Sequence, residues 1–369
     1  MLRAAKVLAM WAAVCVISGL TKEAQGAVDR GSDDCVGIVP DGLPESRSAA
    51  IPRYEGQFCG SVTVDGQGNV AGGSGYPGGN FARWTMFSTA GDQLGQVDAH
   101  LALMPQESGF QGMYTVLDDP WSDRIWIHAA WDPSGRRRTE NGLGSDMYCR
   151  FQLQRNLAGG SQALMACTSS GNLSVRRFDA EGHPLSYWIP VSDRSNGVTG
   201  AIDLNGLTLL VFLDATMFGF GPDDYAARWY DESGNPITDY FPLFTGPGDH
   251  QSSNAIARPL IGGGVAVQIR GEWVAVSPSG AAVSLPPPEW LASHSNYDSE
   301  IVRGGRAYAL IPKWPVEDRN TVPLYSASGN HCGDVTFPLP NVTVGIDGTA
   351  ISSSGDGLCT MTWWPQVLP

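Results

Sequence analysis

One short hairpin signature recurs six times along this chain at nearly equal intervals. Each copy has an apolar, often aromatic residue, then two or three small or acidic residues, then glycine, and usually an apolar residue three positions later. The copies run from Phe87 to Gly91, Trp131 to Gly135, Phe178 to Gly182, Tyr230 to Gly234, Val276 to Gly280 and Tyr325 to Gly329. Their glycines are 44, 47, 52, 46 and 49 residues apart, which indicates one repeated structural unit.

Each copy is typical of two strands joined by a tight turn, because alternating apolar residues flank a turn that ends in glycine. Glycine adopts positive φ without a steric clash. Another pair of short β-type runs precedes each hairpin, for example residues 61–64 and 265–269. Four strands in roughly 40–50 residues predict an all-β propeller of four-stranded blades. A β-sandwich with evenly spaced turns is the alternative for this pattern.

Residues 1–26 predict a secretory signal peptide. Arg3 and Lys6 precede an apolar run from Val7 to Leu20, and Ala24-Gln25-Gly26 has the form of a cleavage site. The apolar run is too short to span a membrane, and no later run is longer. We therefore expect one propeller domain over residues 27–369, in a protein that is secreted, periplasmic or bound at the cell surface without membrane insertion.

The length favours seven blades. Removing 26 of 369 residues leaves 343, about seven times the mean glycine spacing of 47.6. Six blades would result if residues 110–145 were an insertion. The seventh blade is expected to be composite, with inner strands from residues 341–348 and an outer strand from Cys35–Val39, followed by a turn at Asp41-Gly42. Closing the ring with both ends of the chain leaves no free sheet edge.

Six cysteines follow the leader, and an even number in an exported chain favours three disulfides over metal ligation. Cys149 and Cys167 flank a hairpin centred on Gly159 and Gly160. We therefore predict that these two cysteines pair across neighbouring strands.

For the other four cysteines we predict Cys35 with Cys359, as a clasp on the composite blade, and Cys59 with Cys332. The competing pattern joins Cys35 to Cys59 and Cys332 to Cys359. The sequence is compatible with both patterns.

The composition argues against nucleic acid as a partner. The leader contains three of the 23 basic and one of the 37 acidic residues, so the mature chain has 20 and 36, a net charge of −16. An acidic surface repels phosphate backbones. With 42% apolar residues the chain has enough material for a packed core.

The candidate binding site lies in the loops that lead from the outer strand of one blade to the inner strand of the next. These loops contain Gln106–Gly109, Asp193–Asn196, Asp249–Asn254 and His294–Asp298. The ring is expected to gather them into a polar funnel that binds a sugar, although Ser and Asn also form plain turns at strand entries. The candidate ligand-binding residues are Asp193, Asn196, His250, Asn254, His294 and Asn296, with Trp121, Trp290 and Trp314 as platforms for a sugar ring.

The mature chain resembles the broad group of secreted β-propeller repeat proteins, on its period and turn pattern. It lacks the signatures of WD40 and kelch repeats, and it contains no known metalloprotease, nucleophile-elbow or phosphate-loop motif. The resemblance implies no particular residue role, since fold does not determine function.

The absence of a catalytic motif favours a non-enzymatic protein that binds a glycan or an extracellular protein. The alternative is a secreted carbohydrate hydrolase or lyase in which His250 or His294 acts with Asp249 or Asp298. We expect no cofactor or metal; calcium is the only cation for which the polar loops offer an argument.

Overall fold

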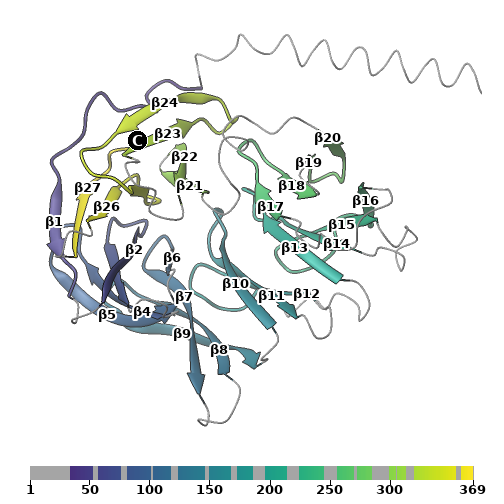
Figure 1. Ribbon diagram of the computed structural model, residues 1–369, viewed down its shortest axis with the longest axis horizontal. Coiled ribbons are helices and arrows are strands. Elements are labelled where there is room, and N and C mark those ends of the chain that lie inside the picture. The colour runs from purple at the N-terminus through teal and green to yellow at the C-terminus, as the bar shows by residue number, and fades with distance from the viewer. Residues whose placement is uncertain are drawn as a thin grey trace, which may run out of the picture.

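Seven antiparallel β-sheets surround a central axis (Figure 1). The computed structural model describes residues 34–52, 57–75, 81–100, 103–117, 124–145, 149–167, 173–185, 196–213, 224–244, 256–269, 272–284, 299–304, 306–312, 320–354 and 359–368. Six sheets are continuous in sequence, and the seventh joins the two ends of the chain. The fold is therefore a seven-bladed propeller, as predicted. Residues 110–145 lie in a blade, so the six-bladed alternative is wrong.

We number the blades along the chain. Blade 1 contains β2 (Phe58–Val64), β3 (Val70–Gly75), β4 (Phe81–Phe87) and β5 (Gln93–His100). Blade 2 contains β6 (Leu103–Pro105), β7 (Phe110–Leu117), β8 (Arg124–Trp131) and β9 (Arg137–Ser145). Blade 3 contains β10 (Cys149–Arg155), β11 (Ser161–Cys167) and β12 (Leu173–Phe178). Blade 4 contains β13 (Asn196–Ile202), β14 (Thr208–Leu213), β15 (Tyr225–Tyr230) and β16 (Phe241–Phe244).

Blade 5 contains β17 (Ile256–Pro259), β18 (Val265–Ile269), β19 (Glu272–Val276) and β20 (Ala282–Ser284). Blade 6 contains β21 (Ser299–Gly304), β22 (Ala307–Pro312), β23 (Thr321–Tyr325) and β24 (His331–Thr336). Blade 7 combines β25 (Thr343–Val344), β26 (Ala350–Ser354) and β27 (Thr360–Trp364) with β1 (Arg47–Ala50). The first strands of neighbouring blades lie side by side around the axis, for example β2 beside β25 and β6.

The composite blade is confirmed, with one correction to its outer strand. The predicted inner segment contributes β25, and the N-terminal part of the chain contributes the outermost strand. That strand is Arg47–Ala50, which pairs antiparallel with β27, and not Cys35–Val39. Cys35–Val39 instead forms turns, and its Ile38 is buried in the apolar cluster between blades 6 and 7. Burial of that side chain fixes the segment against blade 6 before the chain reaches β1.

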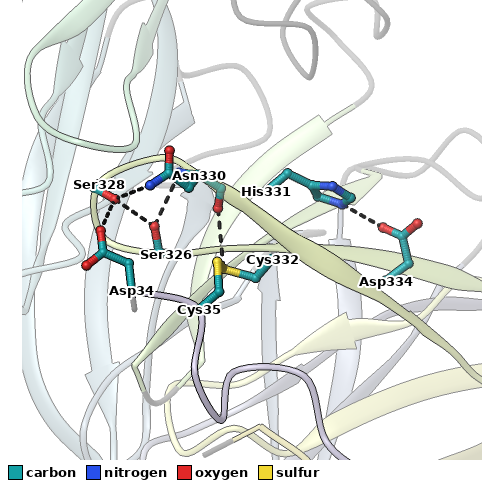
Figure 2. The surroundings of a disulfide bond; sticks show 8 residues. All are labelled: Asp34, Cys35, Ser326, Ser328, Asn330, His331, Cys332 and Asp334. Carbon is teal, nitrogen blue, oxygen red and sulfur yellow. Dashed lines mark hydrogen bonds and ion pairs between the residues drawn. A yellow bond between two sulfur atoms is a disulfide. The ribbon is translucent and has the colours of Figure 1, made fainter. Parts of the chain in front are cut away.

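Two disulfides attach the composite blade to both of its neighbours. Cys35 bonds to Cys332 of blade 6 with Cα atoms 5.1 Å apart, and Cys59 of blade 1 bonds to Cys359 beside β27 with Cα atoms 5.3 Å apart. Both predicted pairing patterns for these cysteines are therefore wrong. The reason is the position of β1: because the outer strand begins at residue 47, Cys35 reaches back to β24, as Figure 2 shows.

The side chains of Cys149 and Cys167 lie outside the described part of the structure, so the predicted disulfide between them is not tested. The backbone places these residues directly opposite each other in the register of β10 and β11. Gly159 and Gly160 both have positive φ in the intervening turn, as the predicted hairpin requires. The pairing of the two thiols stays a prediction.

A common five-residue turn explains the sequence repeat. In blade 2, Asp132 N–H donates to the Arg136 carbonyl (3.0 Å) and Gly135 N–H donates to the Asp132 carbonyl (2.9 Å). The Asp132 carboxylate also accepts from Ser134 N–H at 2.9 Å. Gly135 has φ +79°, a conformation that residues with a Cβ rarely adopt. The glycines of all six predicted hairpins have positive φ, between +79° and +99°.

One apolar cluster fills each of the seven interfaces between neighbouring blades. Trp84 and Phe110 pack between blades 1 and 2, and Trp229 packs against Val267 between blades 4 and 5. Burying a large apolar side chain stabilises a fold by about 1.5–3 kcal/mol. The ring is therefore held together interface by interface, and the closing interface between blades 7 and 1 has its own cluster around Trp363.

The two disulfides are typical of proteins that fold outside the reducing cytoplasm. The predicted signal peptide lies outside the described residues. In the described part of the chain, no helix has the length and apolarity that crossing a membrane requires.

Removing the disulfide between Cys59 and Cys359 should weaken the closed ring. The bond spans 300 residues of sequence, so the Cys59→Ala/Cys359→Ala variant should lose roughly 2–5 kcal/mol of unfolding free energy. Urea denaturation under non-reducing conditions measures this loss. The Cys35→Ala/Cys332→Ala variant is the matched comparison, since its bond spans 297 residues. An unchanged unfolding free energy in both variants would contradict the proposed role of the bonds in closure.

Candidate functional site

The antiparallel order of the strands gives the ring two different ends. Turns between the first and second and between the third and fourth strands of each blade lie at one end, which we call the turn face. Connections between the second and third strands, and the crossings from blade to blade, lie at the other end, the loop face. The predicted funnel belongs to the loop face.

We call the turns between the first and second strands of a blade the inner turns, and those between the third and fourth strands the outer turns. The inner turns repeat the chemistry of the outer turns. Asp203 Oδ1 accepts from Asn205 N–H (2.9 Å) and Leu207 N–H (2.8 Å), and Asp65 Oδ1 accepts from Asn69 N–H at 2.8 Å. This second series of turns was not predicted from the sequence. The signal was present, since each Asp follows an apolar strand and stands three residues before a glycine.

Neighbouring turns bond to one another around the turn face. Asp65 Oδ2 accepts from Gly109 N–H of blade 2 at 2.8 Å, and Gly66 N–H donates to the Gln106 carbonyl at 2.8 Å. Gly160 N–H of blade 3 then donates to Gln106 Oε1 at 2.8 Å. A side chain at Gly109 would meet the Trp131 carbonyl oxygen at 2.2 Å, so inner and outer turns are also in close contact.

Internal bonds occupy most polar groups of this network. Asp65 and Gln106 are buried, and burial raises the pKa of Asp65 although several hydrogen bonds favour its charged form. Leu157 in the inner turn of blade 3 packs against the cluster between blades 5 and 6. Neither of these blades is adjacent to blade 3, so the contact crosses the central channel. Apolar side chains therefore narrow the central channel at the turn face.

One predicted loop belongs to the turn face, which corrects the sequence analysis. Gln106–Gly109 joins β6 to β7 within blade 2 and does not connect two blades. The loop was expected to line the funnel, but the amide of Gln106 bonds to Gly160 instead. The physical reason is that β6 has only three residues, so the chain turns earlier than the repeat length indicates.

Asn196 is the described member of the predicted loop-face set. It is the first residue of β13, and its backbone pairs with Leu213. Since β13 is the innermost strand of blade 4, its start lies at the loop face close to the channel. The predicted role of Asn196 in binding stays a prediction. The other predicted residues lie outside the described residues; they are Asp193, Asp249, His250, Asn254, His294, Asn296, Asp298, Trp121, Trp290 and Trp314.

A serine, a histidine and an aspartate in and after the last outer turn do not form a catalytic triad (Figure 2). Ser328 Oγ donates to Asp34 Oδ2 at 2.6 Å. His331 Nε2 lies 2.9 Å from Asp334 Oδ1 and points away from Ser328. These contacts hold the N-terminal segment and the turn beside the disulfide. In the described part of the chain, no group of three or more His, Cys, Asp or Glu side chains is arranged to hold a metal ion.

No protein-family profile matches the sequence, and no curated protein matches it. Among solved structures, the propeller domain of the trilobed protease from Pyrococcus furiosus is similar over 84% of this chain and 96% of that domain, with 7% identity and a TM-score of 0.48. Prolyl oligopeptidase B from Galerina marginata is similar over 82% of this chain, with 10% identity and a TM-score of 0.45. This chain covers 47% of that enzyme's length. No residue role is carried over from either protein.

The turn network predicts an unequal response to removing two chemically similar aspartates. Asp65→Ala removes the acceptor of buried amides in two blades and should lower the unfolding free energy by about 2–4 kcal/mol. Asp231→Ala, in an exposed outer turn, should cost less than about 1 kcal/mol because water replaces the acceptor. Urea denaturation of both variants measures the difference. Equal losses of unfolding free energy in the two variants would contradict the role of Asp65 in joining two blades.

Proposed function

We propose that the protein is an exported binding protein that recognises a glycan or an extracellular protein through the loop face of its ring. One observation carries the proposal: at the turn face, the inner turns of blades 1, 2 and 3 bond to one another, and apolar side chains narrow the channel there. In the described inner turns, which lie around the channel, the buried polar groups of Asp65 and Gln106 bond within and between turns. Several connections at the loop face are long and differ in sequence, for example residues 245–255 and 285–298. They extend from a scaffold that two disulfides close, which suits a binding surface.

The chemistry of the predicted loops favours a glycan as the first ligand to test. Amide, carboxylate and imidazole groups would bond to sugar hydroxyls, and Trp121, Trp290 or Trp314 would stack on the apolar face of a sugar ring. Asn196 supports this arrangement, since its backbone lies at the loop face beside the channel.

A glycan array tests the proposal directly. The oxidised chain of residues 27–369 should bind a restricted set of glycans, and repeating the array with and without calcium tests the cation. Trp290→Ala and His294→Ala should each weaken a selective hit at least tenfold. Glu181→Ala/Glu232→Ala is the matched control on the turn face and should bind as the unmodified protein does, because both side chains are exposed there.

The outcomes separate the classes of function. Loss of binding only in the turn-face control would overturn the choice of face. A blank array would leave a protein partner as the ligand class for this face. Turnover of a bound glycan that stops in His250→Ala or His294→Ala would establish a carbohydrate-active enzyme in place of a binding protein.

A further inference from the structure

The interface between blades 2 and 3 combines a small apolar cluster with fully buried polar side chains. Its described apolar cluster has four buried residues, Met113, Leu143, Ala163 and Phe178, whereas ten fill the interface between blades 1 and 2. Fully buried polar side chains occupy the remaining space; they are Gln111, His128 and Ser161. Hydrogen bonds therefore replace part of the apolar packing at this interface.

His128 of β8 lies at the centre of this polar group. Its ring stacks on Phe178 of β12, with centroids 3.6 Å apart and planes inclined by 9°. Its Nε2 lies 3.2 Å from Gln111 Oε1 and 3.2 Å from Ser161 Oγ. His128 of blade 2 is thus held by the aromatic ring of Phe178 and the hydroxyl of Ser161, both in blade 3.

The hydrogen bonds determine which ring nitrogen carries the proton. Gln111 Nε2 donates to the Asp179 carbonyl at 2.6 Å, so the Gln111 oxygen faces His128. Ser161 Oγ donates its own hydrogen to that oxygen at 2.6 Å. His128 Nε2 therefore faces acceptors and carries the hydrogen, and Nδ1 has the lone pair. Nδ1 is buried without a hydrogen-bond partner.

The charged surroundings also oppose a proton on Nδ1. Arg176 of β12 is the charge that acts on His128, and burial followed by this arginine lowers the pKa of His128 to about 3. Gln111 of β7 and Ser161 of β11 are neutral. On β9, Arg137 pairs with Glu140. In the blade 3 turn, Asp179 pairs with His183, and Glu181 is exposed to solvent.

We propose that the interface between blades 2 and 3 is an acid-operated latch: neutral His128 keeps the two blades together, and its protonation opens the ring at this interface. A charged imidazole would place a second hydrogen where no acceptor lies and a second cation near Arg176. Opening the interface hydrates the charge. The cost falls on these two blades, because the histidine side chain contacts both of them.

The direction with pH follows from linkage. His128 in the closed ring takes up a proton only near pH 3, whereas an exposed histidine does so near pH 6.5. The free energy that the neutral imidazole of His128 contributes to the closed interface is fully present above pH 6.5 and is lost as the pH falls towards 3. Because the open form binds one more proton in this window, the opening equilibrium should rise by up to about tenfold per pH unit.

Hydrogen exchange measured by mass spectrometry between pH 7.5 and 4.5 tests the latch in the oxidised full chain. After correction for the intrinsic exchange rates, protection of peptides from β8, β11 and β12 should fall by up to tenfold per pH unit below pH 6.5. Peptides from β14 and β18, at the apolar interface between blades 4 and 5, should stay protected. Equal acid sensitivity of the two sets of peptides would overturn the proposal.

Two variants identify the group that titrates. His128→Gln keeps a donor beside Gln111 and removes the titration, so the acid response of β8, β11 and β12 should disappear. His183→Gln is the matched control, since its side chain is 64% exposed, and it should respond as the unmodified protein does. An acid response retained in His128→Gln would overturn the proposal. If that variant does not fold, an NMR titration of His128 in the unmodified chain decides: a pKa above 5.5 excludes the latch.

Discussion

The pairing of β1 with β27 is the interaction on which the rest of the ring depends. The strands come from opposite ends of the described chain, and their pairing makes one blade from two segments. Each other blade forms from a continuous stretch of sequence, so this pairing carries the largest loss of chain entropy. The two disulfides reinforce the same place, since one joins blade 7 to blade 1 and the other joins the segment before β1 to blade 6.

A closed ring also limits where the protein can meet a ligand. Each blade buries its two sides against neighbours through apolar clusters, which leaves the outer rim and the two faces. At the turn face, the turns bond to one another from blade to blade. The connections at the loop face differ from blade to blade in length and sequence, in contrast to the repeated turns. This difference between the two faces is the reason for proposing the loop face as the binding surface.

Much of the fold was predictable because turn chemistry is local. A glycine that must adopt positive φ, three residues after an Asp or Ser, marks the end of each hairpin. Its spacing therefore counts the blades. The inner turns were missed because the residue before them is not aromatic, although Asp65 and Asp203 each follow an apolar residue and stand three residues before a glycine.

Other features depend on geometry that no local pattern contains. The pairing of Cys35 and Cys332 follows from where β1 begins, and this depends on which segment best fits the edge of β27. Gln106 was assigned to the wrong face because β6 is short. Among the candidate ligand-binding residues, the structure describes only the backbone of Asn196, at the start of β13, so the predicted binding site stays a prediction. The loop sequences do not repeat from blade to blade, so the positions of their side chains could not be predicted.

Mapping the disulfides of the oxidised protein tests the closure of the ring most directly. Digestion under non-reducing, acidic conditions and mass spectrometry identify the linked peptides. The account predicts links from Cys35 to Cys332 and from Cys59 to Cys359, which join the composite blade to its neighbours on both sides. Links from Cys35 to Cys59 and from Cys332 to Cys359 would contradict this account, since each would then join residues near the same end of the chain.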